Sequence, residues 1–219
     1  MKYKCVIFDL DGTLIDSLQG ILDAVNLAFK QLGYNVKRNY EEAKYFIGAG
    51  AEQFALRAMK GQNIPFEAKE KVMQTFLVNY LKTQEEATLA FKGINELLTE
   101  LKNNDVKVCI ATNKPQIALE AIVKKLFPNI KFDALLGQRP NKPEKPDPFI
   151  IFEIMKKLGL KEDDCVYIGD SEYDYKTAHN AGIDFICVTY GYGFYNEPWM
   201  NKVKQVAKTV DELKEKVLY

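Results

Sequence analysis

The sequence predicts an α/β fold in which a sheet of parallel strands carries a helical insert after its first strand. Two observations predict it. From residue 91 onward, short apolar runs alternate with helical patterns, the order that gives parallel strands joined by right-handed crossovers. Between residues 16 and 88 the pattern is helical, with no convincing strand. We therefore expect a core domain from residues 1–15 and 89–219 and a helical cap domain from residues 16–88.

The composition is that of a globular protein with one large domain or two small ones. Hydrophobic residues make up 47% of the 219 residues, and acidic and basic residues balance at 30 each. Zero net charge gives no sign of a nucleic-acid or membrane partner, and no apolar run approaches the roughly 20 residues of a membrane span. The cysteines Cys5, Cys109, Cys165 and Cys187 form no metal-ligand spacing and are read as buried hydrophobic residues. With no signal peptide expected, this predicts a cytoplasmic protein.

The first strand leads directly into two acidic residues. Residues 5–8 are apolar, the pattern of a strand buried on both faces. Asp9 and Asp11 follow, and residues two apart in an extended chain point to the same side. Gly12 then permits a sharp turn. Because open α/β sheets bind ligands at the carboxyl ends of their strands, the pair is a candidate site; the alternative is a plain Asp-Gly turn.

The insert contains four predicted helices. Their apolar stripes fall within residues 18–32, 39–48, 54–61 and 65–86. Asn39 and Glu42 have the spacing of a capping box at the start of the second helix. The stretch Gly48-Ala49-Gly50 is interpreted as a turn between helices that could face a ligand, because glycine exposes backbone N–H groups. It does not follow a strand and lacks the third glycine of a dinucleotide-binding loop.

Four further strands and the helices between them complete the predicted core. The strands are expected over residues 106–111, 132–136, 165–168 and 185–188. Helices are expected over residues 94–101, from Lys114-Pro115 to 126, over 149–158, and over a segment that carries Asp174 and ends at Gly182. A last helix begins at a capping box formed by Thr209 and Glu212. Each strand end therefore falls at one edge of a parallel sheet.

Polar side chains from distant parts of the chain converge at this edge only if the sheet forms. They are Asp9 and Asp11, Thr112 and Asn113, and Asp170, with Asp174 one helical turn further on and Lys145 in a proline-rich loop. An oxygen cluster without histidine or thiolate suits Mg²⁺. A hydroxyl, backbone N–H groups and an ammonium beside it would bind an anion. This combination indicates phosphoryl chemistry.

Four motifs in order resemble the haloacid dehalogenase superfamily of phosphohydrolases, in the branch with a helical cap after the first strand and closest to the phosphoglycolate phosphatase-like group. They are Asp9-Leu10-Asp11-Gly12-Thr13, Ala111-Thr112-Asn113-Lys114-Pro115, Lys145-Pro146-Asp147-Pro148 and Gly169-Asp170-Ser171-Glu172-Tyr173-Asp174. The runs Asn180-Ala181-Gly182 and Val188-Thr189-Tyr190-Gly191-Tyr192-Gly193 also resemble that group. The resemblance covers nearly the whole chain and implies a Rossmann-like core.

The resemblance implies a role for each matching residue. Asp9 would be the nucleophile that forms an aspartyl-phosphate, and Asp11 the general acid and base. Mg²⁺ would be held by Asp9, the backbone carbonyl of Asp11, and Asp170. Thr112, Asn113 and Lys145 would bind the phosphoryl group. Asp174 would support the site through a bound water or by holding Lys145.

Plainer interpretations remain open for several residues. Lys142 competes with Lys145, because both precede proline, but Pro148 and Phe149 favour Lys145. Thr112 could be a helix cap and Asp174 an exposed helix acid. His179, the single histidine, is interpreted as a surface residue. Arg57 could reach a substrate carboxylate, but a surface position on its helix is preferred.

The expected function is hydrolysis of a small phosphorylated metabolite, with phosphoglycolate as the named guess. A pyrophosphatase, a nucleotidase and a hexose-phosphate mutase share the implied fold. A dehalogenase is disfavoured, because its chemistry does not need Asp11 and the metal set. A protein of another class, a non-catalytic phosphate-binding protein, would be favoured by loss of Asp9 or Asp11, and both are present. The sequence predicts neither the substrate-selecting cap residues nor the oligomeric state.

Overall fold

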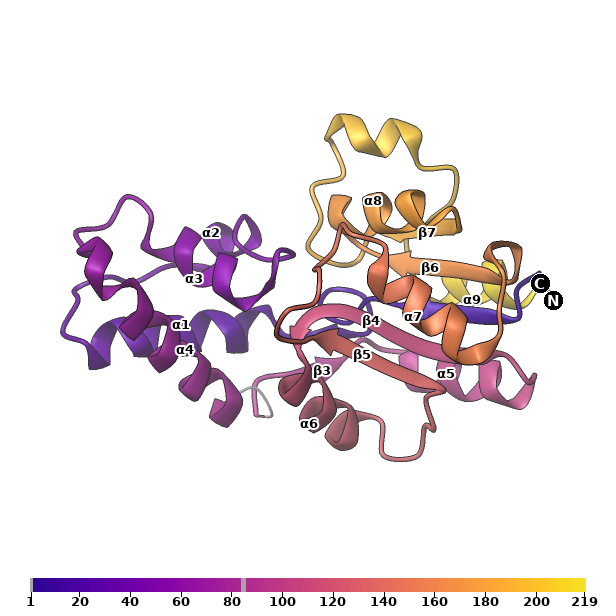
Figure 1. Ribbon diagram of the computed structural model, residues 1–219, viewed down its shortest axis with the longest axis horizontal. Coiled ribbons are helices and arrows are strands. Elements are labelled where there is room, and N and C mark those ends of the chain that lie inside the picture. The colour runs from indigo at the N-terminus through magenta and orange to yellow at the C-terminus, as the bar shows by residue number, and fades with distance from the viewer. Residues whose placement is uncertain (1, 84–85) are drawn as a thin grey trace.

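The computed structural model describes residues 2–83 and 86–219, and its centre is a six-stranded sheet (Figure 1). The strand order is β5-β4-β1-β6-β7-β8, and all neighbouring pairs are parallel. The strands are β1 (Cys5–Phe8), β4 (Lys107–Pro115), β5 (Ala134–Gln138), β6 (Cys165–Gly169), β7 (Asp184–Val188) and β8 (Val206–Ala207). The order reverses at β1, which pairs with β4 on one side and β6 on the other. The carboxyl end of β1 therefore lies at the switch point where such sheets bind ligands.

Helices cover both faces of the sheet, as required by the apolar side chains of β1, which point alternately to the two faces. Val6 and Phe8 belong to one hydrophobic cluster, Cys5 and Ile7 to the other. The first face is covered by α5 (Ile94–Asn103), α6 (Gln116–Leu126) and α9 (Val210–Leu218), the second by α7 (Phe149–Leu158) and α8 (Glu172–Ala181) (Figure 1). Because successive side chains point to opposite faces and both are covered, every residue of β1 is buried.

The insert forms a separate group of helices beyond the carboxyl edge of the sheet (Figure 1). Its elements are α1 (Leu18–Gln31), α2 (Tyr40–Lys44), α3 (Gly50–Met59), the 3₁₀ turn η1 (Phe66–Ala68) and α4 (Lys69–Thr83). The four α-helices share a hydrophobic cluster that includes Phe29, Phe54 and Phe76. The α/β fold class with an inserted helical cap is confirmed. The expected domain boundaries at residues 15/16 and 88/89 stay a prediction.

A short antiparallel ribbon joins the two parts of the molecule. In it β2 (Ile15–Asp16) pairs with β3 (Leu89–Ala90). This ribbon, β8, and the 3₁₀ turns η2 (Glu162–Asp164) and η3 (Pro198–Lys202) were not predicted from the sequence. Two-residue strands have too few positions to show an alternating pattern, so their pairing depends on tertiary context.

The predicted helix boundaries needed three corrections. The capping box of Asn39 is confirmed, but α2 ends at Lys44 rather than near Gly48, and Gly50 begins α3 rather than belonging to a turn. The strand β4 continues to Pro115, which is the N-cap of the next helix, so α6 begins at Gln116 rather than at Lys114-Pro115. A residue before proline prefers an extended backbone, which explains the longer strand. Part of the predicted fourth helix, residues 84–85, lies outside the described residues.

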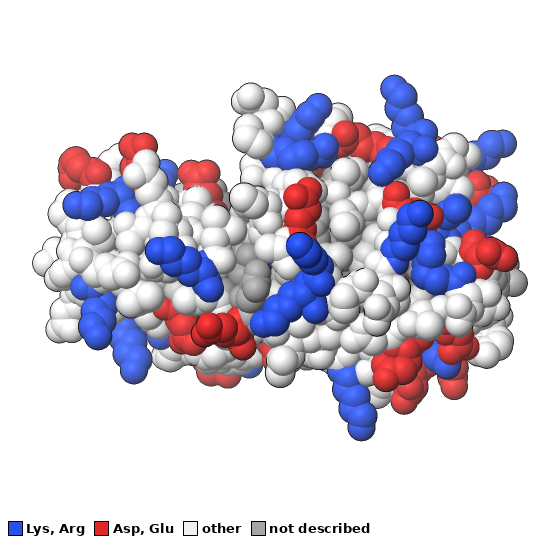
Figure 2. Space-filling model, turned by 90° about the horizontal axis from the view of Figure 1, so that it is seen from below, with Lys and Arg blue, Asp and Glu red and all other residues white. Residues whose placement is uncertain are grey.

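The surface and the cysteines agree with the composition. Basic and acidic side chains are interspersed on the face shown in Figure 2. Cys5, Cys109, Cys165 and Cys187 are buried free thiols, as predicted. Within residues 2–83 and 86–219, no helix combines the length and the apolar character that a membrane span requires.

Candidate active site

Asp9 lies at the carboxyl end of β1, bound to a buried lysine. Its carboxylate oxygen Oδ1 is 2.7 Å from Nζ of Lys145, which is also 2.7 Å from Oδ1 of Asp174 and 3.0 Å from the Tyr167 hydroxyl. These contacts account for the three donors of the ammonium. Burial opposes the charge of Lys145, but Asp174 and Asp9 outweigh it and hold its pKa well above the ordinary value. Lys145 is therefore a fixed cation beside Asp9.

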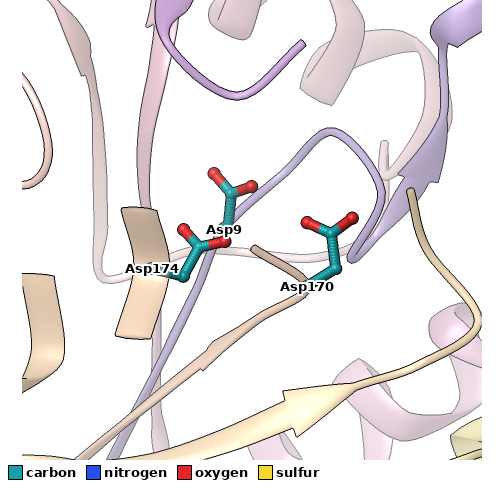
Figure 3. A group of neighbouring side chains, drawn as sticks. All are labelled: Asp9, Asp170 and Asp174. Atoms are coloured by element: carbon teal, nitrogen blue, oxygen red, sulfur yellow. The ribbon is translucent and has the colours of Figure 1, made fainter. Parts of the chain in front are cut away.

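Three carboxylates lie close together at this edge of the sheet, those of Asp9, Asp170 and Asp174 (Figure 3). Asp9, Asp170 and Asp174 each offer an oxygen, and these oxygens lie within 4.8 Å of one another. Burial raises the pKa of Asp9 to about 7, with Lys145 opposing the shift, and burial beside Asp174 and Asp9 raises the pKa of Asp170 well above its ordinary value. When all three are ionised, the carboxylates and the Lys145 ammonium carry a net charge of −2, which a divalent cation with oxygen ligands would neutralise. The donor set therefore fits such an ion.

A glycine-rich run holds Asp170 in place. The backbone N–H of Tyr192 donates to Oδ2 of Asp170 at 2.6 Å. A Cβ atom on Gly191 would lie 2.5 Å from Oδ2 of Asp170, and one on Gly193 would lie 1.9 Å from its backbone oxygen. Gly12, with φ +86°, approaches the same carboxylate from the first motif. No side chain fits at these positions, and the sequence analysis gave Gly191 and Gly193 no role.

Asp11 faces the insert rather than the acidic cluster. Its Oδ1 accepts hydrogen bonds from Nζ of Lys114 at 2.9 Å and from the Ser17 hydroxyl at 2.5 Å. Lys114 is also hydrogen-bonded to the hydroxyl of Tyr80 on α4, so it links the sheet edge to the insert. Sequence reasoning missed Lys114, although it lies within the second motif.

In the second motif, the two side chains expected to bind phosphate, Thr112 and Asn113, form hydrogen bonds with backbone groups. The Asn113 amide accepts from the backbone N–H of Lys145 at 2.8 Å and donates to its carbonyl at 3.2 Å, so Asn113 holds the lysine loop. Its amide nitrogen also donates to the Gly48 carbonyl at 3.3 Å. Thr112 Oγ1 accepts from the N–H of Lys114 at 3.2 Å. The interpretation of Thr112 as a helix cap is wrong, because α6 begins only at Gln116.

The remaining alternatives are resolved by burial. Asp174 is fully buried, so its interpretation as an exposed acid is wrong. Lys142 lies over the Phe149 ring, 4.8 Å from its centroid, whereas Lys145 lies beside Asp9, in line with the preference for Lys145. His179 is exposed, as predicted. Arg57 is half-buried on α3, and it lines the cavity described next.

A cavity separates the sheet edge from the insert, and both parts line it. The core contributes the predicted site residues Asp9, Asp11, Thr112, Asn113, Lys145 and Asp170. The insert contributes the aromatic rings of Tyr45, Phe54, Phe76 and Tyr80, together with aliphatic and basic side chains and two glycines. At one contact between the two parts, the Tyr45 ring stacks on Phe194 with centroids 4.4 Å apart. Asp9, Asp11 and Asp170 therefore line a cavity that the insert covers.

Comparisons with known proteins agree with this geometry. A family model described as haloacid dehalogenase-like hydrolase matches residues 6–188. A phosphoglycolate phosphatase of Colwellia psychrerythraea is 31% identical over 196 residues, covering 87% of this chain and 86% of that protein. Phosphoglycolate phosphatase 1 of Pseudomonas aeruginosa is 30% identical over 193 residues, covering 86% of this chain and 70% of that protein.

A solved structure matches over the full length. It is a crystal structure from Lactobacillus delbrueckii subsp. bulgaricus, of a protein assigned provisionally as a phosphoglycolate phosphatase. It superposes with a TM-score of 0.88 and 33% sequence identity, covering 100% of this chain and 99% of that chain. The sheet and the helical insert therefore have a counterpart of known structure.

Proposed function

Since this chain belongs to the haloacid dehalogenase-like hydrolases, we propose that it is a metal-dependent phosphatase of a small phosphorylated metabolite, with phosphoglycolate as the first substrate to test. The observation that carries the proposal is Asp9, a buried carboxylate at the switch point of the sheet, held by Lys145 and open to the cavity. The relatives named phosphoglycolate phosphatases support the choice of first substrate.

The proposed cofactor is Mg²⁺, held by Asp9, Asp170 and the backbone carbonyl of Asp11. The three buried carboxylates and their excess of two negative charges support a hard divalent cation at this place. When bound, the ion would offset the repulsion between the Asp9 carboxylate and a phosphate dianion. Asp174 is assigned a different task, since its Oδ1 is committed to Lys145 and its Oδ2 to the backbone N–H and hydroxyl of Ser171.

The proposed reaction has two steps. An oxygen of Asp9 attacks phosphorus, the bond from phosphorus to the leaving oxygen breaks, and Asp11 gives that oxygen a proton. Water then attacks the phosphorus of the aspartyl-phosphate and loses a proton to Asp11, which releases inorganic phosphate and restores Asp9. Lys145 and the Thr112 hydroxyl stabilise the charge on the phosphoryl oxygens. Lys114 and Ser17 orient Asp11.

Phosphate release tests this proposal. Phosphoglycolate, a hexose phosphate, a nucleoside monophosphate and inorganic pyrophosphate would each be incubated with the protein in Mg²⁺ and in EDTA. We expect metal-dependent release, greatest from phosphoglycolate. Release mainly from pyrophosphate or a nucleotide would replace the substrate and keep the mechanism. Conversion of one hexose phosphate isomer to another without release would instead identify a mutase. Failure to act on any of them, in folded protein, would favour non-catalytic phosphate binding.

A further inference from the structure

Among the described residues, four basic side chains line the cavity, and three of them are neutralised by carboxylates. Lys145 pairs with Asp9 and Asp174, Lys114 pairs with Asp11, and Lys44 pairs with Glu41 at 2.9 Å. Arg57 is the fourth. Over residues 2–83 and 86–219, Arg57 forms no ion pair with a carboxylate. Arg57 therefore brings an uncompensated positive charge to the cavity wall.

Neutral oxygen atoms fix the position of this guanidinium. One terminal nitrogen donates to the backbone carbonyls of Tyr45 and Phe46, at 3.4 and 3.2 Å, and the other donates to the Tyr173 hydroxyl at 3.0 Å. Arginine has five N–H donors in a rigid fork, and these contacts involve only three of them. Tyr173 lies in the first turn of α8, three residues after Asp170, so the guanidinium is tied to the helix that carries Asp174.

We propose that Arg57 binds a carboxylate on the leaving group of the substrate and so selects phosphorylated carboxylic acids over uncharged phosphate esters. The proposal rests on the proposed function, because it assigns a site for the part of the substrate that Asp9 does not attack. A planar guanidinium matches a carboxylate with two parallel hydrogen bonds. One uncompensated cation also matches one carboxylate in charge, whereas a second phosphate would need more. Tyr173 is a positioning residue, since its hydroxyl orients the fork.

Two substrates of similar size test this inference. Phosphoglycolate carries the carboxylate, and 2-hydroxyethyl phosphate carries a neutral hydroxymethyl group in its place. We expect the ratio of their kcat/KM values to fall by about 10- to 100-fold in Arg57→Gln, the loss typical of a hydrogen bond to a charged group. Arg57→Lys keeps the charge without the fork, so an intermediate ratio is expected. Tyr173→Phe should lower the ratio less, by about 3-fold.

Lys44→Gln is the matched control. It also removes a positive charge from the cavity wall, but one that Glu41 already neutralises, so the ratio should change by less than about 2-fold. Equal losses on both substrates in Arg57→Gln would show that Arg57 only holds the insert in place, and would overturn the inference. A wild-type ratio near one would also overturn it, and so would a strong preference for a bisphosphate that depends on Arg57.

Binding separates this inference from the proposed function. Calorimetry on Asp9→Asn protein with Mg²⁺ measures the Kd of phosphoglycolate without turnover, with and without Arg57→Gln. If the wild type releases no phosphate but phosphoglycolate binds in an Arg57-dependent way, the phosphatase proposal fails and the carboxylate site stands. If phosphate is released but neither the Kd nor the substrate ratio depends on Arg57, the carboxylate site fails and the phosphatase stands.

Discussion

The sheet edge and the helical insert face the same cavity, but their side chains are satisfied in different ways. At the sheet edge, Lys145 is buried and saturated by Asp9, Asp174 and Tyr167. On the insert, Arg57 is only half-buried and has neutral partners. A saturated cluster on a buried sheet keeps its geometry whatever the leaving group is. A wall with an uncompensated charge can discriminate between leaving groups. We therefore assign the proposed phosphoryl transfer to the sheet edge and the proposed selection of the leaving group to the insert.

The largest expected effect would come from removing the carboxylate charge at the sheet edge. Asp9→Asn is nearly isosteric but supplies no nucleophile, so we expect kcat to fall by about 10⁴-fold or more. The Tm should change little, because one of several carboxylates that share a single ammonium is neutralised. Phosphate release and a thermal melt measure the two quantities. Substantial turnover in Asp9→Asn would refute the aspartyl-phosphate mechanism.

Removing the Lys145 ammonium from the acidic cluster should lower the free energy of unfolding. Lys145→Met leaves Asp9, Asp170 and Asp174 buried without an ammonium, and an unpaired buried charge typically costs about 3–5 kcal/mol. Urea unfolding in EDTA would measure the free energy of unfolding. Lys142→Met makes the same change on the same loop outside the cavity and should cost less than about 0.5 kcal/mol. Equal losses for the two variants would mean that the cluster is solvated.

The metal should stabilise the protein more at high pH than at low pH. The pKa of Asp9 is raised from 3.8 to about 7 by burial, so the folded state holds this proton more tightly than the unfolded chain does. Without metal, stability should therefore fall as pH rises from about 4 to 7. Mg²⁺ binds the ionised carboxylates and should reverse this loss, by about 3 kcal/mol at a 100-fold excess over its Kd. Melts with Mg²⁺ and with EDTA at pH 5 and pH 8 would test it; an equal gain at both would contradict it.

The site residues that the sequence predicted are those whose positions depend on a strand and on the residues that follow it. Residues 5–8 are a plain apolar run, so the positions of Asp9 and Asp11 followed from local geometry. The pairing of Lys145 with Asp174 joins residues 29 apart, and only the resemblance to a family suggested it. The cavity contacts of Arg57 and Lys114 could not be predicted, because both depend on how the insert lies against the sheet. Hydrophobic periodicity along the sequence does not indicate such a contact between distant segments.

The smallest expected effect concerns closure of the insert over the sheet edge. Phe194→Ala removes the ring that stacks on Tyr45, with centroids 4.4 Å apart. An aromatic pair contributes about 0.5–1.5 kcal/mol beyond its buried area, so we expect KM to rise about 3- to 10-fold. Phe152→Ala on α7 removes a partly exposed ring outside the cavity and serves as the control.

The Phe194 variant also tests whether closure and chemistry are separate properties. The stack joins the core to the insert, so losing it should weaken binding of every substrate alike, whether or not a carboxylate is present. The ratio of kcat/KM values for phosphoglycolate and 2-hydroxyethyl phosphate should therefore stay constant while KM rises for both. A changed ratio would mean that the aromatic contact itself selects the leaving group, and selectivity would then be shared between Arg57 and the ring pair.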